Sequence, residues 1–238
     1  MQDHDTLPRS AGERVPRKER AKMERRARIV AATRALLREV GIEDLSVKAV
    51  AERAEVSLST LYNLFTSKED VLVSVYHDDL LRFEVLIFEA DSVDQLERIF
   101  DSVDIAADLY GGDPEYYRTI MWRQPYIAGN MRSHYTASRS RRVLMWPKVV
   151  AEIISEGSLV ESASPVVLGT IIMQSISGAL SDWIFDSTSL ARFRLEAKFG
   201  IATALYPYAT ATTKVRLRTR LDQLHDQLAA EPRDGRHP

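Results

Sequence analysis

The sequence contains no cysteine, and it has only 10 glycines and 9 prolines among its 238 residues. The absence of cysteine excludes a disulfide scaffold, a thiol nucleophile and every zinc site with thiolate ligands. The five histidines are scattered without a His-x-x-x-His spacing, so we expect neither a metal site nor a cofactor. The scarcity of glycine and proline leaves little room for the tight turns of an all-β fold. The first residues also lack the apolar stretch that directs secretion, which favours a cytoplasmic, helical protein.

Charge is distributed unevenly along the chain, although the net charge is only −2. Between Arg9 and Arg38 there are 11 Lys and Arg against 3 Glu, whereas between Glu69 and Glu115 there are 14 acidic residues against 2 Arg. A basic head before an acidic body indicates a polyanionic partner at one end only.

Helical periodicity dominates the first part of the chain. A helix is expected from Glu24 to Val40, with Gly41 at its end, and two short helices follow around the tight link Glu55-Val56. A link of this length suits two helices that cross steeply, which is the helix-turn-helix arrangement. Ser57 is expected to cap the second short helix, and the sequence Ser67-Lys68-Glu69-Asp70 resembles a capping box at the start of a long helix.

The remainder also reads as helical, so we predict an all-α protein. The expected helices are 93–110, 115–127, 132–156 with a kink at Pro147, 166–185, 190–206 and one carrying Leu217, Leu221, Leu224 and Leu228. We expect four regions: a disordered basic tail at 1–20, a three-helix unit at 21–67, a larger helical domain at 68–229 and a disordered tail at 230–238.

The segment 166–185 is the most apolar part of the chain and long enough to cross a membrane. Gln174, Asp182 and several serines argue against a membrane span. A helix that is apolar nearly all round in a soluble protein is buried in a core or in an interface between subunits.

The segment from Arg28 to Leu72 carries the most specific pattern. It combines Ile29, Ala32 and Leu36 on the first helix with Ser46, Val50 and Ala51 on the second, and then Val56-Ser57, Thr60-Leu61-Tyr62, Phe65 and Ser67-Lys68-Glu69. This pattern closely resembles the DNA-binding domain of the TetR family of transcriptional regulators. Two positions depart from it: Glu55 replaces the usual glycine before Val-Ser, and Leu64 replaces a frequent histidine.

The resemblance and the helical geometry together assign DNA contacts to the second short helix. Leu61 and Phe65 are four residues apart and can pack inward, which leaves Ser59, Thr60, Tyr62 and Asn63 on the outward side. Asn63 could pair with adenine, and Thr60 or Leu58 could touch a thymine methyl group. By resemblance, Ser46, Lys48, Tyr62 and Lys68 contact phosphates.

Other readings of these residues remain open at this stage. Tyr62 could be a half-buried core tyrosine, the two lysines could be solvated, and Ser46 and Ser57 could serve only as helix caps. The basic stretch 14–28 could follow the DNA backbone or could be a solubilising tail.

The resemblance further implies that the larger domain binds a small-molecule effector and forms a homodimer through helices near 166–206. Aromatic and Met side chains suit an adaptable pocket, so the pocket candidates are Tyr117, Met121, Trp122, Tyr126 and Trp146. A stripe of such residues can equally be plain core.

The expected function is therefore a DNA-binding regulator, most simply a repressor of a palindromic operator that an effector releases. One alternative is a helix-turn-helix protein that organises the chromosome without a small ligand. An enzyme is disfavoured because the sequence has no Gly-rich phosphate loop, Gly-x-Ser-x-Gly elbow or metal motif.

Overall fold

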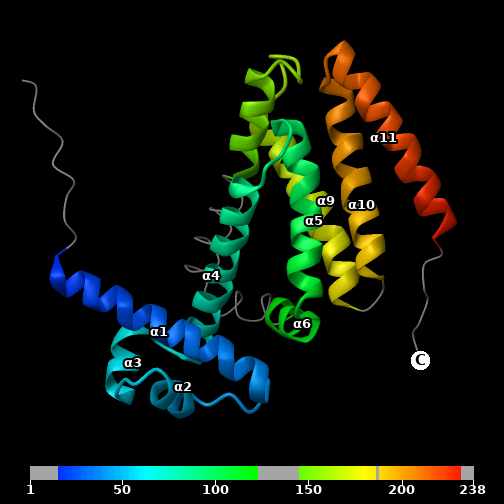
Figure 1. Ribbon diagram of the computed structural model, residues 1–238. Coiled ribbons are helices and arrows are strands. Elements are labelled where there is room, and N and C mark those ends of the chain that lie inside the picture. The colour runs from blue at the N-terminus through cyan, green and yellow to red at the C-terminus, as the bar shows by residue number, and fades with distance from the viewer. Residues whose placement is uncertain (1–15, 123–144, 186–187, 232–238) are drawn as a thin grey trace, which may run out of the picture.

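The computed structural model describes residues 16–122, 145–185 and 188–231. Regular structure in these ranges is helical, apart from one isolated bridge between Leu159 and Ala209, and the all-α prediction is confirmed (Figure 1). The elements are α1 (Arg17–Val40), α2 (Val47–Arg53), α3 (Leu58–Leu64), α4 (Lys68–Glu89), α5 (Gln95–Gly111), α6 (Pro114–Trp122), a helix over 145–155, α9 (Pro165–Ile184), α10 (Leu190–Leu205), a 3-10 turn (Tyr206–Tyr208) and α11 (Ala211–Ala230).

Helices α1, α2 and α3 form a head at one end of the molecule, and α4 rises from this head into the body (Figure 1). The head encloses its own apolar core, in which Ile29, Leu61 and Phe65 are almost completely buried. Helix α1 also packs along α4, so that it contacts both parts of the molecule.

The predicted helix ends in the head are confirmed. The Ser57 hydroxyl accepts a hydrogen bond from the Thr60 N–H at 3.0 Å, and Ser67 does the same for Asp70 at 3.2 Å. Gly41 ends α1 with a φ of 74°, a left-handed conformation that costs glycine little. The Asp70 carboxylate accepts from the Thr66 N–H at 2.8 Å, so it reaches one residue further back than in a standard capping box.

The body is built from α4, α5, α6 and the helices that follow. Helix α10 lies between α9, α5 and α11 and contacts all three. Helix α9 crosses the helix over 145–155 so closely that a Cβ at Gly169 would lie 2.6 Å from the backbone nitrogen of Pro147. Glycine is therefore required at this crossing.

The extent of three helices differs from the prediction or is only partly described. Helix α1 begins at Arg17, so residues 17–20 are helical and not part of a disordered tail, because the helix continues beyond the apolar period that predicts its start near Glu24. The expected helix 132–156 is described only from residue 145, and the end of the expected helix 115–127 lies outside the described residues.

Helix α9 is only partly enclosed by the other described residues. With 20 residues and a mean hydropathy of 1.2, the helix is long and apolar enough to cross a membrane. Core helices of soluble proteins can have the same length and hydropathy. Only 28% of its most apolar 18-residue stretch is buried, and Val166, Val167 and Ile171 are exposed. One side of this helix, with Leu168, Ile172 and Trp183, is buried in the core, and its other apolar side chains form a surface.

Candidate DNA interface and effector pocket

Helices α2 and α3 are joined by a turn that depends on one residue with an unusual backbone conformation. Glu55 has a φ of 53°, which places it in the left-handed region. This conformation lets the Val56 N–H donate to the Ala51 carbonyl at 3.0 Å and closes the end of α2. The turn thus keeps helix-turn-helix geometry although glutamate stands where the family usually has glycine.

Helix α3 has one buried face and one exposed face. Leu61 is fully buried, whereas Tyr62 is 51% exposed and Leu58 44% exposed. Ser59 and Asn63 are exposed as well, and Thr60 is half-buried with its hydroxyl 2.8 Å from that of Ser57. The outer face is free to enter a groove, and its exposure does not suit the reading of Tyr62 as a core residue.

The residues assigned to phosphates have partners inside the head. Ser46 is exposed and caps α2 by accepting from the Ala49 N–H at 3.1 Å. The Lys48 ammonium lies 3.9 Å from the Glu52 carboxylate on the surface, and the Lys68 ammonium donates to the Ile42 carbonyl at 3.0 Å. An ammonium carries three donors, so Lys68 can hold this carbonyl and still bind a phosphate.

Arg26 has an internal structural role that its place in the basic stretch does not reveal. One guanidinium nitrogen donates to the Leu64 carbonyl at the end of α3, and the group lies 4.1 Å from the centroid of the Phe65 ring. A second nitrogen reaches the Ser74 hydroxyl at 3.4 Å. Arg26 therefore fixes α1 against the end of α3, and this partly buried cation is removed from the set expected to face DNA.

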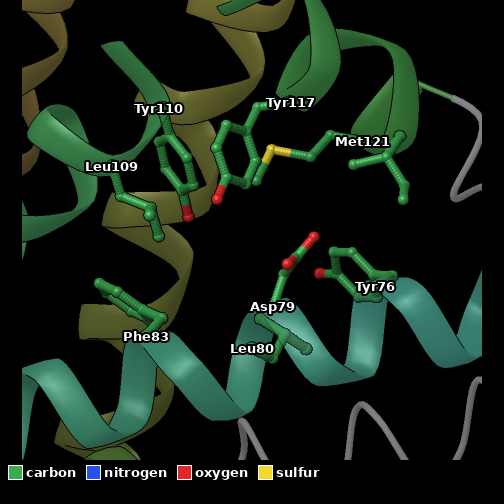
Figure 2. Close-up of a pocket in the computed structure, with 9 residues that line it drawn as sticks. Tyr76, Asp79, Leu80, Phe83, Leu109, Tyr110, Tyr117 and Met121 are labelled. Carbon is green, nitrogen blue, oxygen red and sulfur yellow. The ribbon is translucent and has the colours of Figure 1, made fainter. Parts of the chain in front are cut away.

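A narrow pocket lies in the body where α4, α5 and α6 meet (Figure 2). Figure 2 shows Tyr117 and Met121 from α6 facing Asp79 and Phe83 of α4 across this pocket. The space between the side chains accepts little more than a water molecule. The lining residues are Tyr76, Asp79, Leu80, Phe83, Leu109, Tyr110, Tyr117, Ile120 and Met121.

The predicted pocket residues are thus divided. Tyr117 and Met121 line the pocket, whereas Trp146 is 4% exposed in the core and is not among the lining residues. The Trp122 side chain and Tyr126 lie outside the described part of the structure. Tyr76, Asp79 and Phe83 were missed, although they recur on one stripe of α4 at helical spacing.

Residues 29–75 match the family model described as bacterial regulatory proteins, tetR family. This part of the chain, which forms most of the head, is therefore similar to the DNA-binding segment of the tetR family. Two relatives named HTH-type transcriptional repressor KstR, from Rhodococcus jostii and Mycobacterium tuberculosis, are 45% and 42% identical to this chain over 64 residues. The matches cover 27% of this chain and 30% and 29% of those relatives, which is less than a third of their length.

Solved structures extend the similarity of fold across most of the described molecule. The tetR regulator TylP from Streptomyces fradiae has a TM-score of 0.56 at 21% identity and covers 90% of this chain and 94% of its own. A TetR regulator from Haloarcula marismortui has a TM-score of 0.62 at 16% identity, covering 79% and 100%. SmeT, the repressor of a Stenotrophomonas maltophilia multidrug efflux pump, was also solved in complex with triclosan, with a TM-score of 0.57 at 17% identity, covering 79% and 93%.

A buried polar network connects the head of this chain to the pocket. Arg34 of α1 donates to Asp79 of α4 at 3.1 Å and to Asp78 at 2.6 Å. The Tyr116 hydroxyl of α6 donates to the other oxygen of Asp79 at 2.5 Å. Because Asp79 also lines the pocket, one carboxylate touches both the head and the pocket.

Burial governs the protonation of this network. Burial raises the pKa of Asp79, and the hydrogen bond from Tyr116 and the charge of Arg34 act against it. Burial and the hydrogen bond to Asp79 raise the pKa of Tyr116, so its hydroxyl keeps the proton that it donates. Burial acts to lower the pKa of Arg34, but the hydrogen bond to Asp78 and the charge of Asp79 outweigh it and the pKa is raised.

Sequence reasoning missed the network, although one signal was available. Arg34 lies on the same face of α1 as Val30 and Leu37, where an unpaired arginine would be costly. A charged residue on a buried stripe predicts an acidic partner elsewhere, but the sequence does not say which of many acids it is.

Proposed function

We propose that this chain is a transcriptional repressor that binds a palindromic operator in double-stranded DNA as a homodimer and is released by a small-molecule effector. The observation that carries the proposal is the exposed outer face of α3, where Ser59, Tyr62 and Asn63 stand opposite the buried Leu61. Such a face can place polar groups at base edges while the head stays folded. The family model and the KstR relatives, which match this part of the chain, support the assignment.

The exposed stripe of α9 supports a homodimer through the helices near 166–206. Val167, Ile171 and Phe185 are each more than 40% exposed, and Gln174 and Gly178 lie between them on the same face. Burial of this stripe against a second copy would remove its apolar side chains from water. A two-fold dimer then presents two α3 helices to two half-sites of the operator.

The pocket between α4, α5 and α6 is the proposed effector site, with Tyr117 and Met121 among its walls. Because it is narrow, an effector must move these helices apart, and α4 leads directly into the head. A ligand that prefers the opened arrangement lowers operator affinity only by its difference in affinity for the two arrangements, commonly about 1–3 kcal/mol. We place the protein in the cytoplasm, where its operator lies, and propose a regulator and not an enzyme.

The decisive experiment is selection of bound duplexes from random DNA, followed by fluorescence anisotropy at two salt concentrations. We expect a palindromic sequence to bind at nanomolar concentrations and to lose affinity steeply with salt. Equal binding of all duplexes would overturn the repressor proposal in favour of a protein that organises the chromosome.

A substitution in α3 separates base recognition from general affinity. We expect Asn63→Ala to relax the selected sequence at one position in each half-site, because the amide that pairs with a base is lost, at a cost of about 1–3 kcal/mol. Gln223→Ala, on the exposed surface of α11, is the control and should leave the selected sequence unchanged. An unchanged sequence logo for Asn63→Ala would remove this residue from the recognition set.

A further inference from the structure

The first three turns of α1 extend beyond the core of the head. The first fully buried residue of α1 is Ile29, and the side chains of residues 17–28 are exposed or only partly buried. Figure 1 shows this end of α1 continuing past α3 without another helix beside it. Packing of apolar side chains therefore does not explain why the helix continues so far.

One stripe of α1 changes character along the helix. In its second half the stripe carries Ile29, Thr33 and Leu36, which are buried against the head. Seven and eleven residues before Ile29 the same stripe carries Lys22 and Lys18, because these spacings correspond to about two and three turns. The lysines therefore continue the face with which α1 covers the head.

Arg26 shows where this face points at the edge of the head. Its guanidinium donates a hydrogen bond to the carbonyl of Leu64, and Leu64 is the last residue of α3. At a rise of 1.5 Å per residue, Lys22 and Lys18 lie about 6 and about 12 Å further along the axis of α1. They project beyond the C-terminal end of the helix proposed to enter the major groove.

Both lysines are exposed, and no acidic side chain in the described ranges forms an ion pair with either. Arg17 and Arg20 add further exposed positive charge to the same turns. A cationic stripe on a rigid helix loses little conformational freedom when it binds, in contrast to a flexible arm.

We propose that Lys18 and Lys22 bind backbone phosphates of the DNA that flanks each operator half-site, beyond the end of α3. This inference rests on the proposed repressor function and adds a second contact surface to it. A distance of about 6 to 12 Å corresponds to about two to four base pairs outside the groove that α3 enters. The contact is electrostatic and carries no base specificity.

The test combines a charge substitution with two lengths of duplex, using the full chain. Lys18→Gln/Lys22→Gln removes the charges and keeps residues that favour helix. On a long operator duplex we expect the slope of log affinity against log salt to fall by about 2 to 4, since each dimer loses up to four phosphate contacts. Lys214→Gln/Arg218→Gln on α11 removes the same number of exposed charges and should leave the slope unchanged.

The second arm shortens the duplex by four base pairs at each end, so that it stops near the half-sites. Wild type and the Lys18→Gln/Lys22→Gln variant should then show equal slopes, because the flanking phosphates are absent. An unchanged slope on the long duplex with intact sequence preference would overturn the flanking contact and leave the repressor proposal standing. A slope difference that persists on the short duplex would place the lysines elsewhere and equally overturn it. Loss of sequence preference in the wild type would instead overturn the repressor proposal.

Discussion

Glu55 occupies a turn whose backbone conformation is unfavourable for a residue with a side chain. Its φ of 53° puts the Cβ of an L-residue too close to its own carbonyl oxygen, a strain that glycine does not have. The turn nevertheless forms because the caps and buried side chains on either side of it determine where α2 and α3 pack. The sequence pattern located this turn correctly but could not show that glutamate would adopt the glycine conformation there.

We expect Glu55→Gly to stabilise the protein by about 1 kcal/mol, because relief of the strain exceeds the loss of the exposed ion pair with Arg28. Urea unfolding would measure the change. Glu52→Gly, one turn earlier within α2, is the matched control and should destabilise by about 1 kcal/mol. If both substitutions destabilised the protein, the side-chain interactions of Glu55 would stabilise the fold by more than its backbone strain costs.

At the scale of the elements, side chains that cap helices also join them. Asp94 caps α5 by accepting from the Glu97 N–H at 2.8 Å, and its other oxygen lies 2.8 Å from Arg216 of α11. Arg220 reaches Glu97 on the same turn and stacks over Phe100 at 3.9 Å. Helix α11 is thus joined to the start of α5 by charge, while it packs against α10.

The cap gives a prediction with a defined pH dependence. Burial acts to raise the pKa of Asp94, but the hydrogen bonds from Arg216 and from the Glu97 backbone outweigh it and the pKa is lowered. A lowered carboxyl pKa contributes stability above the ordinary value near 4, and this contribution is lost as pH falls through the lower folded value. We expect Asp94→Asn, which keeps the cap and loses the charge, to be about 0.5–1 kcal/mol less stable at pH 7.

Chemical unfolding between pH 7 and pH 2.5 would check this prediction. The difference from wild type should shrink below pH 4 and vanish once Asp94 is protonated in both states. Asp226→Asn on exposed α11 should show no such trend. A difference that stays constant across the range would assign the loss to packing and not to charge.

Much of the element order was predictable from the sequence, for physical reasons that differ between positions. Helix ends marked by Gly41, Ser57 and Ser67 could be located because capping is local chemistry within four residues. The contact of Arg26 with Leu64 and the Arg34–Asp79 pair could not be predicted. Their partners are 38 and 45 residues apart in the sequence, and such contacts depend on how the helices cross. The pocket was predicted from α6 and the chain that follows it, and the walls contributed by α4 and α5 were missed for the same reason.

At the scale of the whole molecule, the Arg34–Asp79–Tyr116 network connects three helices by groups that are mostly out of water. Removal of one donor leaves a buried carboxylate oxygen short of a partner, which costs more than the hydrogen bond itself contributes. The three residues therefore behave as a unit, and the head cannot tilt against α4 and α6 without breaking one of these bonds.

We expect Tyr116→Phe to destabilise the protein by about 1–3 kcal/mol, because one oxygen of Asp79 loses its donor. Tyr117→Phe is the control, since its hydroxyl forms no hydrogen bond with the described residues, and it should cost less than about 0.5 kcal/mol. Thermal or urea unfolding of the two variants gives the comparison. Equal losses would contradict a special role for the Tyr116 hydroxyl.

Helix α1 is continuous from Lys18 to Arg34, and this gives the molecule a lever. Arg34 is held by the body, and Lys18 lies 16 residues away, which is about 24 Å at a rise of 1.5 Å per residue. A tilt of about 5° at the held end displaces the free end by about 2 Å, which is enough to break a hydrogen bond to a phosphate. A small tilt of α1 at Arg34 is thus magnified at Lys18, where we propose the contact with DNA.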